Sequence, residues 1–171
     1  WWLNKNNILM PTKKIIDSLY EQIIKIKKDN SLLIKVSEEI NVRAFQDELW
    51  LVKSERFLSP YEIIWRGEDK ILLPDQSQLI FRSEKGAGFS LEKLGVTALR
   101  IQNRLGGEKF KPNLNQPSRT LKYLLQKSKI PPWQREKIPL IFSEDTLVAV
   151  PNFGVHHEFV ADEDKIGLTI E

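Results

Sequence analysis

The spacing of apolar residues changes near residue 30, and this change limits the folds that the sequence can adopt. Between Pro11 and Asp29, isoleucine and leucine recur at the three- and four-residue intervals that place them on one face of a helix. From residue 32 to 53, apolar and polar residues alternate, as in strands with one buried face. Segment 43–53 is expected to form a hairpin that turns at Asp47 and Glu48.

Short strand-like segments continue to the C-terminus. They are predicted within 61–67, 70–74, 77–82, 97–104, 138–143, 146–151, 154–161 and 166–170. Glycine marks a loop at 84–95 and another at 105–118. A helix is predicted at 118–129, and a second short helix begins at Pro131-Pro132-Trp133.

This order contains no regular β-α-β alternation, which favours the α+β class. We predict a small helix-plus-strands unit, residues 1–56. A mixed α+β C-terminal domain with antiparallel strands and two short helices, residues 57–171, follows it.

Composition excludes several classes of site and location. The chain has no cysteine, which rules out disulfides, cysteine-ligated zinc, iron–sulfur clusters and a thiol nucleophile. The lack of cysteine fits a reducing compartment, and we expect a cytoplasmic protein. No apolar run is long enough to predict a membrane span. Because the chain opens on Trp1, we expect a longer protein whose N-terminal part is not present here.

No catalytic motif is found. The segment GAGFSL lacks the third glycine of a dinucleotide-binding loop, and LGGEKF lacks the Ser or Thr of a Walker loop. Residues 162–165 lack the spacing of a calcium loop and are predicted to form a hairpin turn. His156 and His157 are adjacent, so on a strand they would point to opposite faces and would not share a metal ion. We predict no catalytic residue and no metal site.

Positive charge is concentrated in one segment. Residues 100–137 contain ten basic and two acidic side chains, a net charge of +8, whereas the whole chain has a net charge of +3. Such an asymmetry is typical of proteins that bind a polyanion.

The expected helix 118–129 belongs to this segment. Leu121, Leu124 and Leu125 are predicted to face the core. Basic and polar residues line the other face, with Ser118 as the cap (Arg119, Lys122, Gln126 and Lys129). Phe110 lies between two lysines, and two interpretations stay open: an anchor in the core, which we favour, or a platform on which a base stacks. Trp133 is interpreted as a packing residue.

Fifty contiguous residues, 106–155, carry a more specific pattern. Its parts are GGEKFKP, SRTLK, IPPWQR, PLIF and LVAVPNFGV, in this order. The pattern resembles the C-terminal domain of bacterial tRNA(Ile)-lysidine synthases. The opening WWLNKNNILMPT and the segment VRAFQDELWLVK resemble the end of the middle, substrate-binding domain of that family.

The resemblance implies an activity for the parent enzyme. It joins lysine to the wobble cytidine of an isoleucine tRNA with a CAU anticodon, and it uses ATP and Mg²⁺. The family's catalytic domain lies N-terminal to the matched part and bears a Ser-Gly-Gly-x-Asp-Ser loop, which this chain lacks. We therefore expect this chain to bind tRNA, to hold no cofactor of its own and to be inactive alone. The enzyme's own N-terminal domain is a second expected partner, and a homodimer stays open.

The predicted RNA-binding residues are basic side chains of the charged segment. They are Lys109, Lys111, Arg119, Lys122 and Lys129, with Arg104 and Arg135 as weaker candidates. The alternative hypothesis is a protein-interaction module that packs this basic face on an acidic partner.

Overall fold

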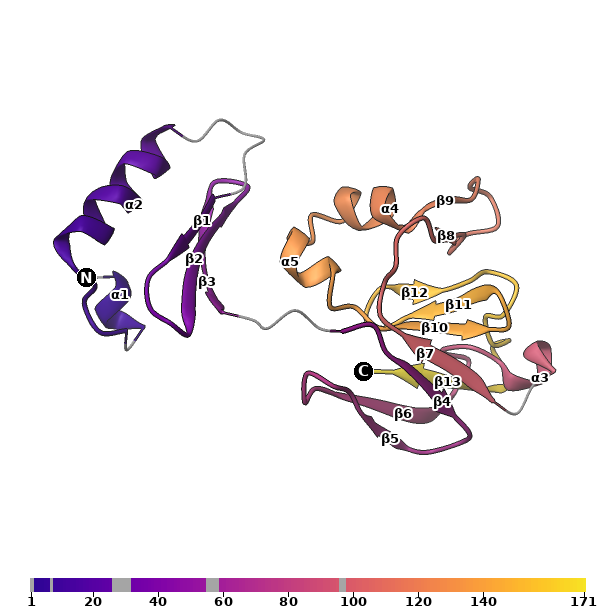
Figure 1. Ribbon diagram of the computed structural model, residues 1–171. Coiled ribbons are helices and arrows are strands. Elements are labelled where there is room, and N and C mark those ends of the chain that lie inside the picture. The colour runs from indigo at the N-terminus through magenta and orange to yellow at the C-terminus, as the bar shows by residue number, and fades with distance from the viewer. Residues whose placement is uncertain (1, 7, 26–31, 55–58, 96–97) are drawn as a thin grey trace. The chain divides into compact units, whose positions relative to one another are not determined.

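The computed structural model describes residues 2–6, 8–25, 32–54, 59–95 and 98–171, and the chain divides into two compact units, 1–57 and 58–171 (Figure 1). The predicted boundary, between residues 56 and 57, lies outside the described residues. The roles that the sequence assigned to the two segments stay predictions.

The first unit packs helices on a small sheet. Its elements are α1 (Trp2–Lys5), α2 (Lys13–Lys25), β1 (Leu32–Lys35), β2 (Ile40–Phe45) and β3 (Glu48–Lys53). The strands form an antiparallel sheet in the order β1-β2-β3. Gln46 and Asp47 join β2 to β3 with φ angles of 50° and 64°, the conformation of the two-residue turns that suit hairpins. The predicted helix and hairpin are confirmed, but the hairpin turns one residue earlier than predicted, because Glu48 pairs with Phe45 and already belongs to β3.

The second unit contains most of the strands. Its elements are β4 (Glu62–Trp65), β5 (Lys70–Leu72), β6 (Gln78–Lys85), α3 (Leu91–Leu94), β7 (Leu99–Gln102), β8 (Lys109–Phe110), β9 (Arg119–Thr120), α4 (Leu121–Lys127), α5 (Pro132–Arg135), β10 (Leu140–Ser143), β11 (Thr146–Val150), β12 (Gly154–Val155) and β13 (Ile166–Ile170). They form a five-stranded sheet, β12-β11-β10-β7-β4, a three-stranded sheet, β13-β6-β5, and the pair β8-β9, all antiparallel. The predicted α+β class is confirmed.

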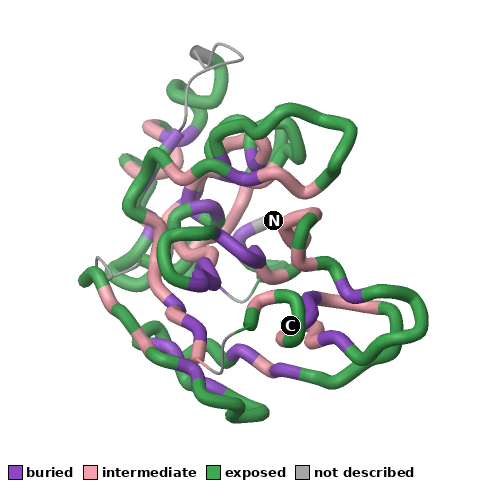
Figure 2. Tube along the Cα trace, turned by 90° about the vertical axis from the view of Figure 1, so that its right-hand side faces the viewer, coloured by how far each residue is buried: buried purple, intermediate pink, exposed green. Residues whose placement is uncertain are grey.

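The five-stranded sheet is covered on both faces, because successive side chains of β10 belong to two different cores. Ile141 belongs to a core shared with Ile71 and Phe81 of the three-stranded sheet. Leu140 and Phe142 point to the opposite face and join a second core that includes α4. Buried positions accordingly recur along the strands, and long exposed segments connect them (Figure 2).

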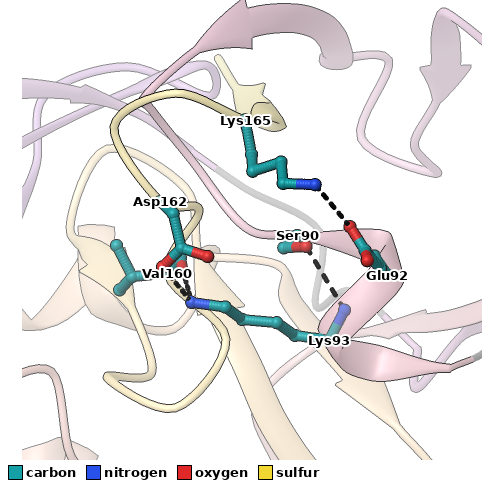
Figure 3. Close-up of polar contacts among 6 residues, drawn as sticks. All are labelled: Ser90, Glu92, Lys93, Val160, Asp162 and Lys165. Atoms are coloured by element: carbon teal, nitrogen blue, oxygen red, sulfur yellow. Dashed lines mark hydrogen bonds and ion pairs between the residues drawn. The ribbon is translucent and has the colours of Figure 1, made fainter.

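The predicted loop 84–95 is partly wrong, because it ends in the short helix α3. The Ser90 side chain accepts a hydrogen bond from the backbone N–H of Lys93 and caps this helix (Figure 3). The Lys93 ammonium donates to the carbonyl of Val160 at 2.7 Å and to the Asp162 carboxylate at 2.6 Å. These contacts attach α3 to the acidic turn that precedes β13.

The hairpin predicted around residues 162–165 is also wrong. A turn is present, with the Lys165 N–H donating to the Asp162 carbonyl, but β13 pairs with β6 rather than with the segment just before the turn. The strand predicted at 154–161 is reduced to β12 because the chain turns at His156.

Candidate nucleic-acid interface

The basic segment is anchored to the five-stranded sheet by apolar side chains. Phe110 is 1% exposed and packs with Leu121, Leu125, Leu140 and Phe142. Its ring centroid lies 6.2 Å from that of Phe153. Because this ring is enclosed, the core interpretation of Phe110 is confirmed and the stacking interpretation is wrong.

The pair β8-β9 closes the loop between residues 110 and 119. Lys109 lies opposite Thr120, and Phe110 lies opposite Arg119. The backbone N–H of Leu121 donates to the Glu108 carbonyl at 2.8 Å, which extends this pairing to the start of α4. Lys109 and Arg119, ten positions apart in sequence, therefore lie on neighbouring strands and are both exposed.

Helix α4 is shorter than the predicted helix 118–129. Thr120 caps it, since its Oγ1 accepts a hydrogen bond from the N–H of Tyr123, and the predicted cap Ser118 is wrong. Arg119 belongs to β9, and Lys129 lies past the C-terminus of the helix with a φ of 58°. The predicted four-residue helical face is therefore wrong, because only Lys122 and Gln126 share α4.

Three of the predicted cations meet at one hollow of about 330 Å³. Its lining consists of Arg104, Leu105, Gly106, Lys122, Pro132, Arg135 and Glu136. The side chains come from the segment after β7, from α4 and from the α5 region. Lys109, Lys111, Arg119 and Lys129 do not line this hollow.

The two arginines of the hollow are held firmly by the fold. Arg104 forms an ion pair with Glu108, with 3.7 Å between its Nε and the Glu108 Oε2. Glu108 Oε1 accepts hydrogen bonds from the backbone N–H groups of Leu105 and Gly106, at 2.8 and 2.6 Å. The Nε of Arg135 donates to the Ile130 carbonyl. Burial lowers the pKa of Arg135, and the nearby charge of Arg104 lowers it further.

Other cations of the segment have structural partners. The Arg100 guanidinium donates to the Glu144 carbonyl at 2.8 Å and lies 3.9 Å from the Glu62 carboxylate. These contacts partly neutralise Arg100, which is one of the ten basic residues behind the net charge of +8 in residues 100–137.

Sequence reasoning missed an exposed aromatic side chain in the basic segment. Tyr123 is 50% exposed, and the guanidinium carbon of Arg119 lies 5.8 Å from the centroid of its ring. Its place beside Lys122 in a helix with no acidic residue could have indicated it. The buried side chain of Trp133 is a packing residue, as predicted.

The adjacent histidines are arranged differently from the prediction. They lie in a turn, so the rings of His156 and His157 stack with centroids 4.8 Å apart instead of pointing to opposite faces. Burial and then the neighbouring His157 lower the pKa of His156. Within the described ranges, no group of three His, Cys, Asp or Glu side chains could hold a metal ion.

Comparison with known proteins identifies the relatives of both units. Residues 99–171 match the family model described as "TilS substrate C-terminal domain". The tRNA(Ile)-lysidine synthase of Nitrosomonas europaea is 28% identical over 165 residues, which cover 95% of this chain and 36% of that protein. The tRNA(Ile)-lysidine synthase of Buchnera aphidicola is 29% identical, and the match covers 96% of this chain and 37% of that protein.

A solved structure shares the fold. The crystal structure of a TILS C-terminal domain superposes with a TM-score of 0.51 at 16% identity, over 65% of this chain and 97% of that one. The resemblance predicted from the sequence is confirmed. The chain spans just over a third of the length of the curated relatives that it matches. Among the described residues, no helix has the length and hydrophobicity that a membrane span requires.

Proposed function

Because the chain resembles the C-terminal part of tRNA(Ile)-lysidine synthases along nearly its whole length, we propose that it is the tRNA-recognition portion of such an enzyme. The basic segment of the second unit, residues 100–137, binds the phosphate backbone of the RNA. In the whole enzyme, lysine is joined to the wobble cytidine of an isoleucine tRNA, with ATP and Mg²⁺ bound by the N-terminal domain. The protein works in the cytoplasm.

The observation that carries this proposal is the placement of the basic side chains. Lys109, Arg119 and Lys122 are exposed, whereas their sequence neighbours Phe110 and Leu121 are buried in one core. None of these three cations forms an ion pair with a carboxylate of the described residues. Free cations on a rigid support can neutralise phosphates without first breaking internal ion pairs.

Salt dependence of tRNA binding tests the proposal. If the surface contacts four to five phosphates, the logarithm of the association constant should fall with the logarithm of salt concentration with a slope of roughly −3 to −4. The double variant Arg119→Glu/Lys122→Glu should bind more weakly and show a flatter slope.

A matched control separates this surface from the overall charge. The double variant Lys70→Glu/Lys85→Glu changes net charge equally, with two exposed residues of the same unit outside the basic segment. It should retain most of the affinity. Equal loss of tRNA affinity in the two double variants would contradict the proposed surface. Failure of the wild-type chain to bind tRNA would contradict the proposed function and favour an acidic protein partner.

A further inference from the structure

We propose that Tyr123 and Arg119 form a platform on which one unpaired base of the bound RNA stacks. The proposal rests on the function proposed above and names the part of the RNA that this surface contacts, a nucleotide outside the base-paired stems. The ring of Tyr123 contacts the base of that nucleotide, and the guanidinium of Arg119 contacts its phosphate.

The ring of Tyr123 is available to a ligand. Tyr123 is 50% exposed, whereas every other Phe, Tyr or Trp that the structure describes in the second unit is buried or half-buried. Phe110, the other aromatic residue considered for stacking, is enclosed in the core. The Tyr123 hydroxyl makes no hydrogen bond with any residue in the described ranges. Among the described aromatic rings of the second unit, this one is therefore the best placed to meet a base.

Helix α4 holds this ring away from the core. Leu121 and Leu125 are each two positions from Tyr123 and are both fully buried against the sheet. With about 3.6 residues per turn, Tyr123 lies on the opposite side of the helix from these anchors. Its backbone N–H donates to Oγ1 of the cap Thr120 at 3.4 Å, which fixes Tyr123 in the first turn. The ring is thus presented from an anchored support.

Arg119 places a cation beside the ring. Its guanidinium carbon lies over the Tyr123 ring, 5.8 Å from the centroid, at the point where β9 leads directly into α4 (Figure 1). Arg119 is exposed and pairs with no carboxylate in the described part of the chain. A guanidinium binds phosphate oxygens through a fixed fork of N–H groups. The pair therefore offers one group for a phosphate and, beside it, a ring for a base.

The surroundings of the pair match RNA in charge. Lys122 adjoins Tyr123 in sequence, and Lys109 lies opposite Thr120 on the neighbouring strand β8. Both lysines are exposed, and α4 contains no acidic residue that would repel a phosphate. These cations attract the RNA backbone to the place where the ring lies.

An aromatic ring among cations favours an unpaired base over a duplex. Bases inside a duplex already stack on one another, whereas unpaired bases are free to stack on aromatic side chains and on guanidinium planes. Cations alone would suffice for a duplex backbone, and the exposed ring adds nothing to that contact. We therefore assign the platform to a single-stranded nucleotide.

Substitutions of Tyr123 test the platform without a change in charge. Tyr123→Leu removes the ring but keeps apolar bulk and a good helix former, and Tyr123→Phe keeps the ring. Tyr20→Leu is the matched control, because Tyr20 is 69% exposed on helix α2 of the first unit. We expect Tyr123→Leu to weaken tRNA binding by at least about fivefold with an unchanged salt slope, because a stacking contact and no phosphate contact is lost. Tyr123→Phe should restore binding, and Tyr20→Leu should change it less than about twofold.

Two RNA probes test the preference for an unpaired base. One is a single strand of mixed sequence without self-complementarity, and the other is the same strand annealed to its complement. Tyr123→Leu should lose at least about fivefold in affinity for the single strand and less than about twofold for the duplex. A urea midpoint of Tyr123→Leu close to that of the wild type excludes misfolding as the cause.

NMR of the wild-type chain tests the platform without any substitution. The ring protons of Tyr123 should move upfield when the single strand is added, because a stacked base shields them. Resonances that stay in place while the single strand binds would overturn the platform.

The outcomes distinguish the platform from the function on which it rests. If tRNA binds the wild type and Tyr123→Leu equally well, the platform is wrong and the function stands. If the single strand binds through Tyr123 but tRNA does not bind, the platform stands and the proposed function is refuted. Equal losses for single strand and duplex, or equal losses in Tyr123→Leu and Tyr20→Leu, would overturn the platform. Binding of neither RNA would refute both and favour an acidic protein partner.

Discussion

Replacement of Phe110 by alanine should detach the basic segment from the sheet. The ring is 1% exposed and packs among the leucines of α4 and β10. Removing a fully buried phenylalanine costs about 3 to 5 kcal/mol, from lost burial and the cavity that remains. With a urea m-value of about 1.5 kcal/mol/M, the unfolding midpoint of the second unit should fall by about 2 to 3 M.

The assay follows urea unfolding through resonances of β10 and β11, so that it reports on the second unit alone. Phe110→Leu keeps most of the apolar volume and should lose about 1 to 1.5 kcal/mol. While folded, it should bind tRNA as the wild type does. A Phe110→Ala midpoint within experimental error of the wild type would refute the anchoring role, as would a folded leucine variant that no longer binds tRNA.

Three further predictions concern local features. Thr120→Ala removes the cap of α4 and should lower the unfolding free energy by about 1 kcal/mol, whereas Ser118→Ala should change it by less than about 0.5 kcal/mol in the same urea titration. Gly88→Ala should lower the thermal midpoint markedly, because φ is +73° and a Cβ there would lie 2.0 Å from the Leu168 carbonyl oxygen. The lowered pKa of His156 means that the unfolded chain takes up this proton more readily. Stability should therefore fall as pH drops below about 6.5, and His156→Gln should remove that part of the pH dependence of the urea midpoint.

The sequence predicted correctly those helices and strands whose residue spacing and turn residues are sufficient to define them. Helix α2 follows from its apolar spacing, and the β2–β3 hairpin follows from strand alternation around a polar turn. The signals of α3 were also present, because Ser90 caps it and Gly95 ends it with a φ of 64°. The glycines before this helix favoured a loop, and four residues are too few to show a period.

Long-range pairing explains the elements that the sequence predicted wrongly. Arg119 and Thr120 fit an amphipathic helix, but they pair with Phe110 and Lys109 and so belong to a strand. The hollow could not be predicted, because its cations lie at positions 104, 122 and 135. They come from the segment after β7, from α4 and from α5, which only the tertiary fold brings together.

Mapping of the RNA contact tests the central claim most directly. Isotope-labelled chain is titrated with isoleucine tRNA, and backbone and side-chain shifts are recorded for every assigned residue. We predict that the largest shifts gather between residues 104 and 129 and at Arg135, on β8, β9, α4 and the hollow. Shifts confined to the first unit or to the three-stranded sheet, with this segment unchanged, would contradict the account.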